Sequence, residues 1–373
     1  MPTSTTPTRT SPPAGKPGLH VVALGGTIAS TVTSTGGVAP QVSAEDIAAA
    51  ARLDTLPDGA PQMTFRQIAQ VSSGSIELDH LVAVVHEARR AAARGIDGLV
   101  LTQGTDTLED SAFVLSLLND SGIPVVVTGA MRNPTLPGAD GPANVRAAAL
   151  AALDPRLRPL PSLVVMADEI HDPTAVTKSH ASSVATFGSG PSLGPLGWVS
   201  EDRVVLGHMP ASLAQGFTVP AEGRQGQGSS TGDRAPAAGL RRGSVQGASG
   251  AGTDWPKVAH VEVGLHDSLD LLDALPGLGY RGVVLAGVGG GHVPAWTVEK
   301  VVELARRVPV VLASRTGSGA TLERTYGYRG GEIELLDASL HSAGRLHPRK
   351  ARLLLTLALH FGVPAEQAFA QFR

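Results

Sequence analysis

Two short segments of the chain place threonine hydroxyls beside glycines or a carboxylate, a combination suited to covalent acyl transfer. The first is Gly25-Gly26-Thr27, where glycines let the backbone approach a ligand and let its N–H groups face a developing oxyanion. The second is Thr102–Thr107, in which Thr105 and Asp106 are adjacent. A threonine hydroxyl is a poor nucleophile without a base, so a further segment has to supply one.

Lys178, which follows Thr177, can act on such a hydroxyl. A lysine is ordinarily a solvated surface charge, and it takes part in catalysis only where the fold buries it against a partner. We therefore expect a Thr105–Lys178–Asp106 relay if the fold brings the two segments together. Asp106 can also cap the helix that follows it or hold a substrate ammonium group.

The elements that position these segments are predicted from runs of apolar residues. Continuous apolar runs predict buried strands, and apolar residues at helical spacing predict helices. The predicted strands cover residues 19–24, 98–102, 124–128, 163–166, 283–286 and 310–313, and the predicted helices 43–53, 78–95, 108–118, 142–153, 298–308 and 348–360. Buried strands that alternate with helices indicate βαβ units and a parallel sheet, in which ligands bind at the carboxyl ends of strands.

The length of the chain and shifts in its composition predict two domains. The 373 residues exceed what one ordinary core holds. Residues 1–18, rich in Pro, Ser and Thr, predict a disordered tail ahead of an N-terminal catalytic domain at 19–216. Gly, Ser, Gln, Arg and Ala dominate 217–254, which predicts a flexible linker or insertion before a C-terminal domain at 255–373. The fold class is therefore α/β, with a larger N-terminal parallel-sheet domain of three layers and a smaller C-terminal α/β domain.

Charge and composition argue against several classes of protein. Thirty basic and thirty-three acidic residues leave a net charge of −3, which gives no basis for nucleic acid or membrane partners. The chain has no cysteine, which excludes disulfides, thiolate metal sites and a cysteine nucleophile. Its histidines show no metal-binding spacing, so we expect neither a metal nor a cofactor. No signal-like segment and no apolar run near ~18 residues is present, which predicts a soluble, cytoplasmic protein.

Several sequence blocks resemble the bacterial-type (type I/II) L-asparaginases. Leu24–Ser30 resembles the first signature of that family and Gln103–Asp110 resembles the second. The likeness extends from Leu19 to Arg373 except for residues 217–254. The further matching blocks are Gly129–Arg132, Ala139–Pro142, Asp172–Phe187, Ala286–His292, Ser314–Arg315, Gly319–Thr321 and Leu346–Arg352.

The resemblance implies an enzyme that hydrolyses L-asparagine to L-aspartate and ammonia, with glutaminase activity as a secondary reaction. Thr27 would be the nucleophile that attacks the side-chain amide carbon. Thr105, Lys178 and Asp106 would form a second catalytic cluster, and water would cleave the acyl-threonine ester.

The resemblance also implies the residues that bind substrate. Ser73 would bind the α-carboxylate and Asp106 the α-ammonium group, with Gly26, Gly74 and Thr105 as further contacts. Gly74 stands where many relatives have a glutamine, which removes one substrate contact.

Family members are usually homotetramers built of intimate dimers, whose active sites borrow residues from the partner's C-terminal domain, so we expect a homotetramer here. Many relatives have a tyrosine in the loop after the nucleophile, whereas this chain has none before Tyr280. Tyr326 aligns with a position often held by a glutamate that the partner donates. We therefore predict that Tyr326 supplies the missing hydroxyl.

Three other functions stay open. They are a glutaminase–asparaginase, the asparaginase-like subunit of an archaeal-type tRNA amidotransferase, and a binding module that keeps the fold without catalysis. The lack of a basic surface argues against the tRNA role. The presence of all four catalytic residues argues against the binding module. Substrate preference is not fixed by the sequence, since one methylene is worth only about 1–3 kcal/mol in a small pocket.

Overall fold

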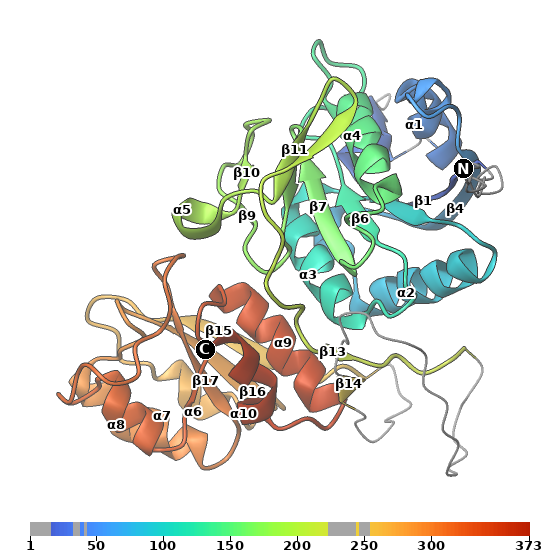
Figure 1. Ribbon diagram of the computed structural model, residues 1–373. Coiled ribbons are helices and arrows are strands. Elements are labelled where there is room, and N and C mark those ends of the chain that lie inside the picture. Colours follow the sequence, from blue (N-terminus) through green and yellow to red (C-terminus); the bar gives the residue numbers. More distant parts are fainter. Residues whose placement is uncertain (1–15, 33–37, 41–42, 223–243, 246–253) are drawn as a thin grey trace, which may run out of the picture.

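A computed structural model describes residues 16–32, 38–40, 43–222, 244–245 and 254–373 of the chain. They form two α/β domains, which confirms the predicted fold class (Figure 1). Residues 1–15 of the predicted tail lie outside the described residues, as does most of the predicted linker, at 223–243 and 246–253. Among the described residues, no helix is long and apolar enough to cross a membrane.

The N-terminal domain is built on one eight-stranded sheet. In spatial order its strands are β12 (Arg203–Leu206), β11 (Gly197–Ser200), β8 (Glu169–His171), β7 (Ser162–Met166), β6 (Val125–Thr128), β5 (Gly98–Thr102), β1 (Gly18–Gly25) and β4 (Gln62–Val71). The five strands from β7 to β4 run parallel, as the alternation of strands and helices predicted. β8, β11 and β12 pair antiparallel at one edge, which the apolar runs did not predict.

Two pairs of helices cover the two faces of this sheet and make three layers (Figure 1). α1 (Ala44–Ala50) and α4 (Gly141–Leu153) lie on one face, and α2 (Leu78–Ala93) and α3 (Leu108–Leu118) lie on the other. Successive side chains of a strand point to opposite faces. Accordingly, Val21 of β1 packs in the core cluster of α1 and α4, whereas Val22 packs in that of α2 and α3.

The C-terminal domain has a four-stranded parallel sheet and five helices among its described residues. The strands, in spatial order, are β15 (Val258–Glu262), β16 (Gly282–Gly287), β17 (Val310–Ser314) and β18 (His341–Ser342). The helices are α6 (Leu271–Ala274), α7 (Val298–Ala305), α8 (Glu332–Asp337), α9 (Pro348–His360) and α10 (Ala365–Phe369). All the predicted strands and helices of both domains are present, although the helix predicted at 43–53 ends at Ala50 and the one predicted to reach residue 308 ends at Ala305.

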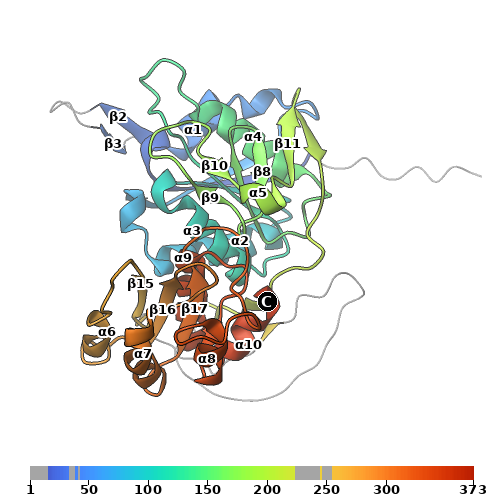
Figure 2. The same ribbon diagram turned by 90° about the vertical axis from the view of Figure 1, so that its left-hand side faces the viewer.

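The two domains share one hydrophobic core. α3 is buried on nearly all sides, because the sheet covers one face and α9 of the C-terminal domain covers the other (Figures 1 and 2). The same cluster of buried residues includes Phe113 of α3, Leu354 of α9 and Val284 of β16. Phe217 and Val219 also belong to it, so the first residues of the predicted linker are packed.

The remaining elements are short. They are β2 (Ser30–Val32), β3 (Val38–Pro40), β9 (Thr177–Lys178), β10 (Phe187–Gly188), α5 (Gly190–Leu193), β13 (Gly216–Phe217) and β14 (Ser244–Val245), besides single 3-10 turns. β9 and β10 pair antiparallel and lie beside the carboxyl ends of the parallel strands.

Candidate active site

Three neighbouring strands deliver the predicted site residues to one edge of the sheet. β4, β1 and β5 are adjacent and parallel, so their carboxyl ends coincide. Ser73 follows β4, Thr27 follows β1, and Thr105 and Asp106 follow β5. Ser73, Thr27 and Thr105 each begin a 3-10 turn, and Asp106 is the residue after Thr105 in the same turn. Thr27 is half-buried, whereas Ser73 and Thr105 are buried.

Glycine backbones bring the loops after these strands into contact. Gly26 has φ +87°, and a Cβ atom placed on it would lie 2.1 Å from the Gly104 nitrogen. A Cβ on Gly104 would in turn lie 2.8 Å from Cβ of Ser73. Because only glycine accommodates both the close approach and the left-handed backbone, Gly26 sets how near Thr27 comes to the Thr105 loop.

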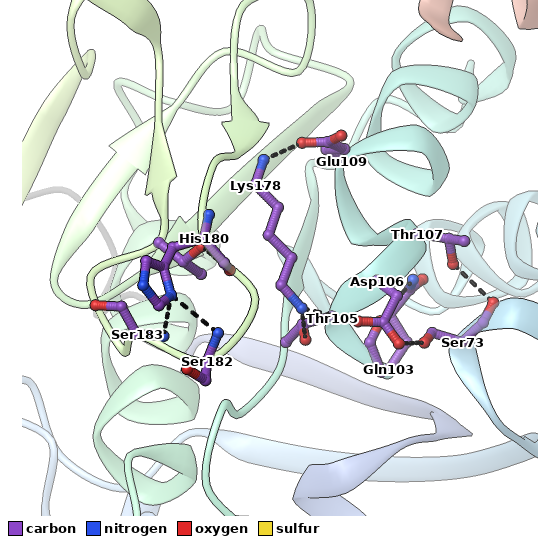
Figure 3. Close-up of polar contacts among 12 residues, drawn as sticks. Ser73, Gln103, Thr105, Asp106, Thr107, Glu109, Lys178, His180, Ser182 and Ser183 are labelled. Atoms are coloured by element: carbon purple, nitrogen blue, oxygen red, sulfur yellow. Dashed lines mark hydrogen bonds and ion pairs between the residues drawn. The ribbon is translucent and has the colours of Figure 1, made fainter.

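Lys178 reaches this edge from β9 and contacts the loop after β5 (Figure 3). Its Nζ donates to Thr105 Oγ1 at 2.9 Å and to Asp106 Oδ1 at 2.8 Å. Ser73 Oγ donates to Asp106 Oδ2 at 2.8 Å. The structure therefore brings together Ser73, Thr105, Asp106 and Lys178, which the sequence placed in three separate segments.

The cationic side chain of this cluster is shielded from solvent, whereas the anionic side chain is exposed. The Lys178 side chain is only 11% exposed, and that of Asp106 is 74% exposed. The hydrogen bond from Lys178, and next the one from Ser73, lower the pKa of Asp106 below its ordinary value. Asp106 is thus a carboxylate that a solvent-borne cation can approach, and the Thr105 hydroxyl lies against the lysine ammonium. An exposed anion beside a polarised hydroxyl suits binding and acyl transfer of a zwitterionic amide.

Two predicted residues lie at the margin of this cluster or away from it. Gly74 is exposed next to Ser73, and a Cβ placed on it would have nothing within 4 Å. Tyr326 is 42% exposed in the C-terminal domain, where its ring contacts those of His292 and Tyr328 at centroid distances of 5.2 and 5.3 Å. Within the described part of a single chain, therefore, Tyr326 is not brought to Lys178.

A buried charge cluster behind Lys178 was missed from the sequence. Glu109 accepts a hydrogen bond from the Lys178 backbone N–H and forms an ion pair with Arg349 at 2.5 Å. Lys350 Nζ donates to the Val176 carbonyl oxygen at 2.5 Å. These residues fall inside the Gln103–Asp110 and Leu346–Arg352 blocks, but their pairing across the two domains has no local signal.

Burial shifts the pKa values of Glu109 and Lys350. It raises the pKa of Glu109 despite the nearby cations Arg349 and Lys350. It lowers the pKa of Lys350 from 10.5 to about 8, although Glu109, Asp110 and Asp172 oppose that shift. Lys350 therefore keeps its proton below about pH 8 in the folded protein, but loses it at a lower pH than an exposed lysine does.

We expect the folded state to gain stability from Lys350 as the pH rises from about 8 to about 10. In that window Lys350 is neutral in the folded chain but protonated in the unfolded chain, so unfolding takes up a proton. The free energy of unfolding, measured in urea at constant ionic strength, should rise relative to Lys350→Met by up to roughly 3 kcal/mol. A constant difference between the two proteins across this window would contradict the prediction.

Two protein-family models match the chain. The model "Asparaginase, N-terminal" matches residues 18–212, and the model "Glutaminase/Asparaginase C-terminal domain" matches residues 257–372. The first match includes Ser73, Thr105, Asp106 and Lys178. The second match includes Arg349, Lys350 and Tyr326.

Three curated relatives are similar over nearly their whole length. A "Probable L-asparaginase" of Deinococcus radiodurans is 33% identical over 95% of this chain and 96% of the relative. A "Probable L-asparaginase periplasmic" of Haemophilus influenzae is 31% identical over 93% of this chain and 89% of the relative. The "L-asparaginase 2" of Escherichia coli is 30% identical over 92% of this chain and 89% of the relative.

Proposed function

The chain belongs to the asparaginase family, and we propose that it is an amidohydrolase that converts L-asparagine to L-aspartate and ammonia. The observation that carries the proposal is the Ser73–Asp106–Lys178–Thr105 network, which lies against the glycine loop that ends in Thr27. The names of the relatives support the same reaction.

Thr27 is the proposed nucleophile. Its hydroxyl oxygen attacks the side-chain amide carbon of asparagine, backbone N–H groups of the glycine loop hold the oxyanion, and ammonia leaves. Water then cleaves the acyl-threonine ester and releases aspartate. Thr105 and Lys178 serve proton transfer in this scheme, since the 2.9 Å contact lets the lysine polarise the Thr105 hydroxyl.

Ser73 and Asp106 are the proposed anchors of the substrate backbone. The exposed, ionised Asp106 receives the α-ammonium group, and the Ser73 hydroxyl turns from Asp106 Oδ2 to donate to the α-carboxylate. Thr107 Oγ1 donates to the Ser73 carbonyl oxygen at 2.8 Å and so fixes the Ser73 loop against the start of α3. Gly26 lets the Thr27 loop approach these groups closely, and the glycine at 74 leaves room and offers no side-chain contact to the substrate.

The test is ammonia release by the purified protein from L-asparagine, L-glutamine and D-asparagine. We expect release to be fastest from L-asparagine, with slower release from L-glutamine as the secondary activity. Equal or faster release from L-glutamine would favour a glutaminase–asparaginase instead. A rise in melting temperature with asparagine but no ammonia would favour the binding module.

Tyr326 is proposed to act in the active site of a partner subunit within the expected homotetramer. Its hydroxyl would replace that of the tyrosine that relatives carry in the loop after the nucleophile. We expect Tyr326→Phe to lower kcat by about 10-fold or more, as loss of a proton-transfer group does, and to leave the melting temperature unchanged. Turnover equal to that of the unmodified protein would remove Tyr326 from the site.

The homotetramer of intimate dimers and the cytoplasmic location remain proposals. Sedimentation velocity measures the first, and fractionation of the source cells measures the second. The Haemophilus influenzae relative is named periplasmic, so the location varies among relatives.

A further inference from the structure

The catalytic lysine is carried by a very short element. β9 consists of Thr177 and Lys178, and within the described part of the chain it pairs with the two residues of β10 alone. Two residues of strand give few hydrogen bonds, and a lysine side chain has four rotatable bonds whose freedom has to be restricted. Other contacts must therefore fix the backbone from which Lys178 extends.

Two consecutive residues of α9, in the other domain, provide these contacts. Lys350 Nζ donates to the carbonyl oxygen of Val176, two residues before Lys178. Arg349 forms its ion pair with Glu109, whose second carboxylate oxygen accepts from the Lys178 backbone N–H. The backbone just before Lys178 is thus held at two points by the start of one helix, directly by Lys350 and through Glu109 by Arg349.

The carboxylate of Glu109 is the link between these parts. It belongs to the first turn of α3, three residues after Asp106, and is only 1% exposed. Figure 3 shows Lys178 extending from Glu109 at its backbone end to Thr105 and Asp106 at its ammonium end. One carboxylate therefore ties the Lys178 backbone to the helix that follows the 3-10 turn of Thr105 and Asp106, the two partners of its side chain.

Burial of Glu109 and Lys350 makes the arrangement specific, and the half-exposed Arg349 side chain meets Glu109 from the solvent side. Arg349 and Lys350 face Glu109 and Asp110, and Asp172 and Arg352 are the further charged groups that act on this cluster. A buried ion that loses its partner costs the folded state several kcal/mol, so the buried Glu109 and Lys350 hold their partners in place.

We propose that Arg349 and Lys350, through Glu109 and the Val176 carbonyl, position Lys178 for the reaction and so couple docking of the C-terminal domain to catalysis. These are positioning residues, because they do not touch the reacting atoms. The inference rests on the amidohydrolase function proposed above.

The kinetic test compares Arg349→Met with Arg349→Lys and with Asp79→Ala. Arg349→Met removes the cation, and Arg349→Lys keeps it. Asp79→Ala is the matched control, since Asp79 accepts an interdomain hydrogen bond from Trp255 at 2.8 Å near the other end of α9. We expect Arg349→Met to lower kcat for L-asparagine about 10-fold or more with KM within about twofold. Arg349→Lys should recover most of that loss, and Asp79→Ala should keep kcat.

A second measurement does not depend on activity. Hydrogen exchange of the Lys178 amide should be at least about 10-fold faster in Arg349→Met than in the unmodified protein, and unchanged in Asp79→Ala. If the unmodified protein hydrolyses no amide, the proposed function fails while exchange still tests the positioning. Unchanged kcat together with unchanged exchange in Arg349→Met would overturn the inference, as would an equal loss of kcat in Asp79→Ala.

Discussion

Thr27→Ala should release ammonia from L-asparagine at least about 10³-fold more slowly than the unmodified protein. The expected loss is this large because the variant lacks the oxygen that would form the acyl bond, and no other group replaces it at that point. Binding of asparagine should persist, since Ser73, Asp106 and Lys178 keep their contacts. The measurements are coupled ammonia detection for turnover and calorimetry for binding.

Thr105→Ala is the informative companion, because it removes the other threonine hydroxyl of the site. Rapid acid quenching followed by peptide mass analysis should locate the aspartyl ester on the peptide that contains Thr27 in the unmodified protein. In Thr105→Ala, the ester should accumulate on the same peptide if Lys178 and Thr105 serve its hydrolysis. An ester found on Thr105, or full turnover by Thr27→Ala, would reverse the roles of the two threonines.

Gly26→Ala should either fail to fold or lose more than about 4 kcal/mol of stability. The left-handed backbone alone costs a non-glycine residue about 1–2 kcal/mol. The larger part comes from the Cβ atom, which would lie 2.1 Å from a backbone nitrogen that has no freedom to rotate away. Any folded fraction has to separate the Thr27 loop from the Thr105 loop, so its ammonia release should be abolished.

The variant Gly59→Ala separates the cost of the left-handed backbone from the cost of the close contact of the Cβ atom. Gly59 has φ +89°, close to the +87° of Gly26, but a Cβ placed on it would meet nothing within 4 Å. This control should therefore lose only the cost of the left-handed backbone, measured by urea unfolding. If Gly26→Ala and Gly59→Ala unfold at the same urea concentration, the close approach at Gly26 has no energetic consequence.

Strands that are buried along their whole length were predicted correctly from the sequence. β1 and β5 are buried along their whole length, and their continuous apolar runs predicted them with nearly correct ends. β4 was missed although it leads to Ser73, because it is a partly exposed edge strand whose Arg66 and Gln70 interrupt the apolar pattern. Strand pairing, and not local composition, makes that segment a strand.

The site residues that lie in loops after the ends of strands could be predicted from the sequence. Thr27, Thr105 and Asp106 each lie in the loop that follows such an end, and parallel strands bring these positions together. The contacts of Lys178 depend on a two-residue strand, and those of Arg349 depend on docking of the other domain. Contacts between residues so distant in the sequence have no local pattern, so only the structure reveals them.

The shared core also constrains how the protein is made. α3 carries Phe113 and is covered by α9, which begins at residue 348 of the 373. During synthesis the N-terminal domain emerges before α9, and the apolar face of α3 stays uncovered until α9 has left the ribosome. Such a surface invites aggregation or chaperone binding in the growing chain. Ribosome-bound chains that stop before residue 348 should therefore be the species that cellular chaperones hold most strongly.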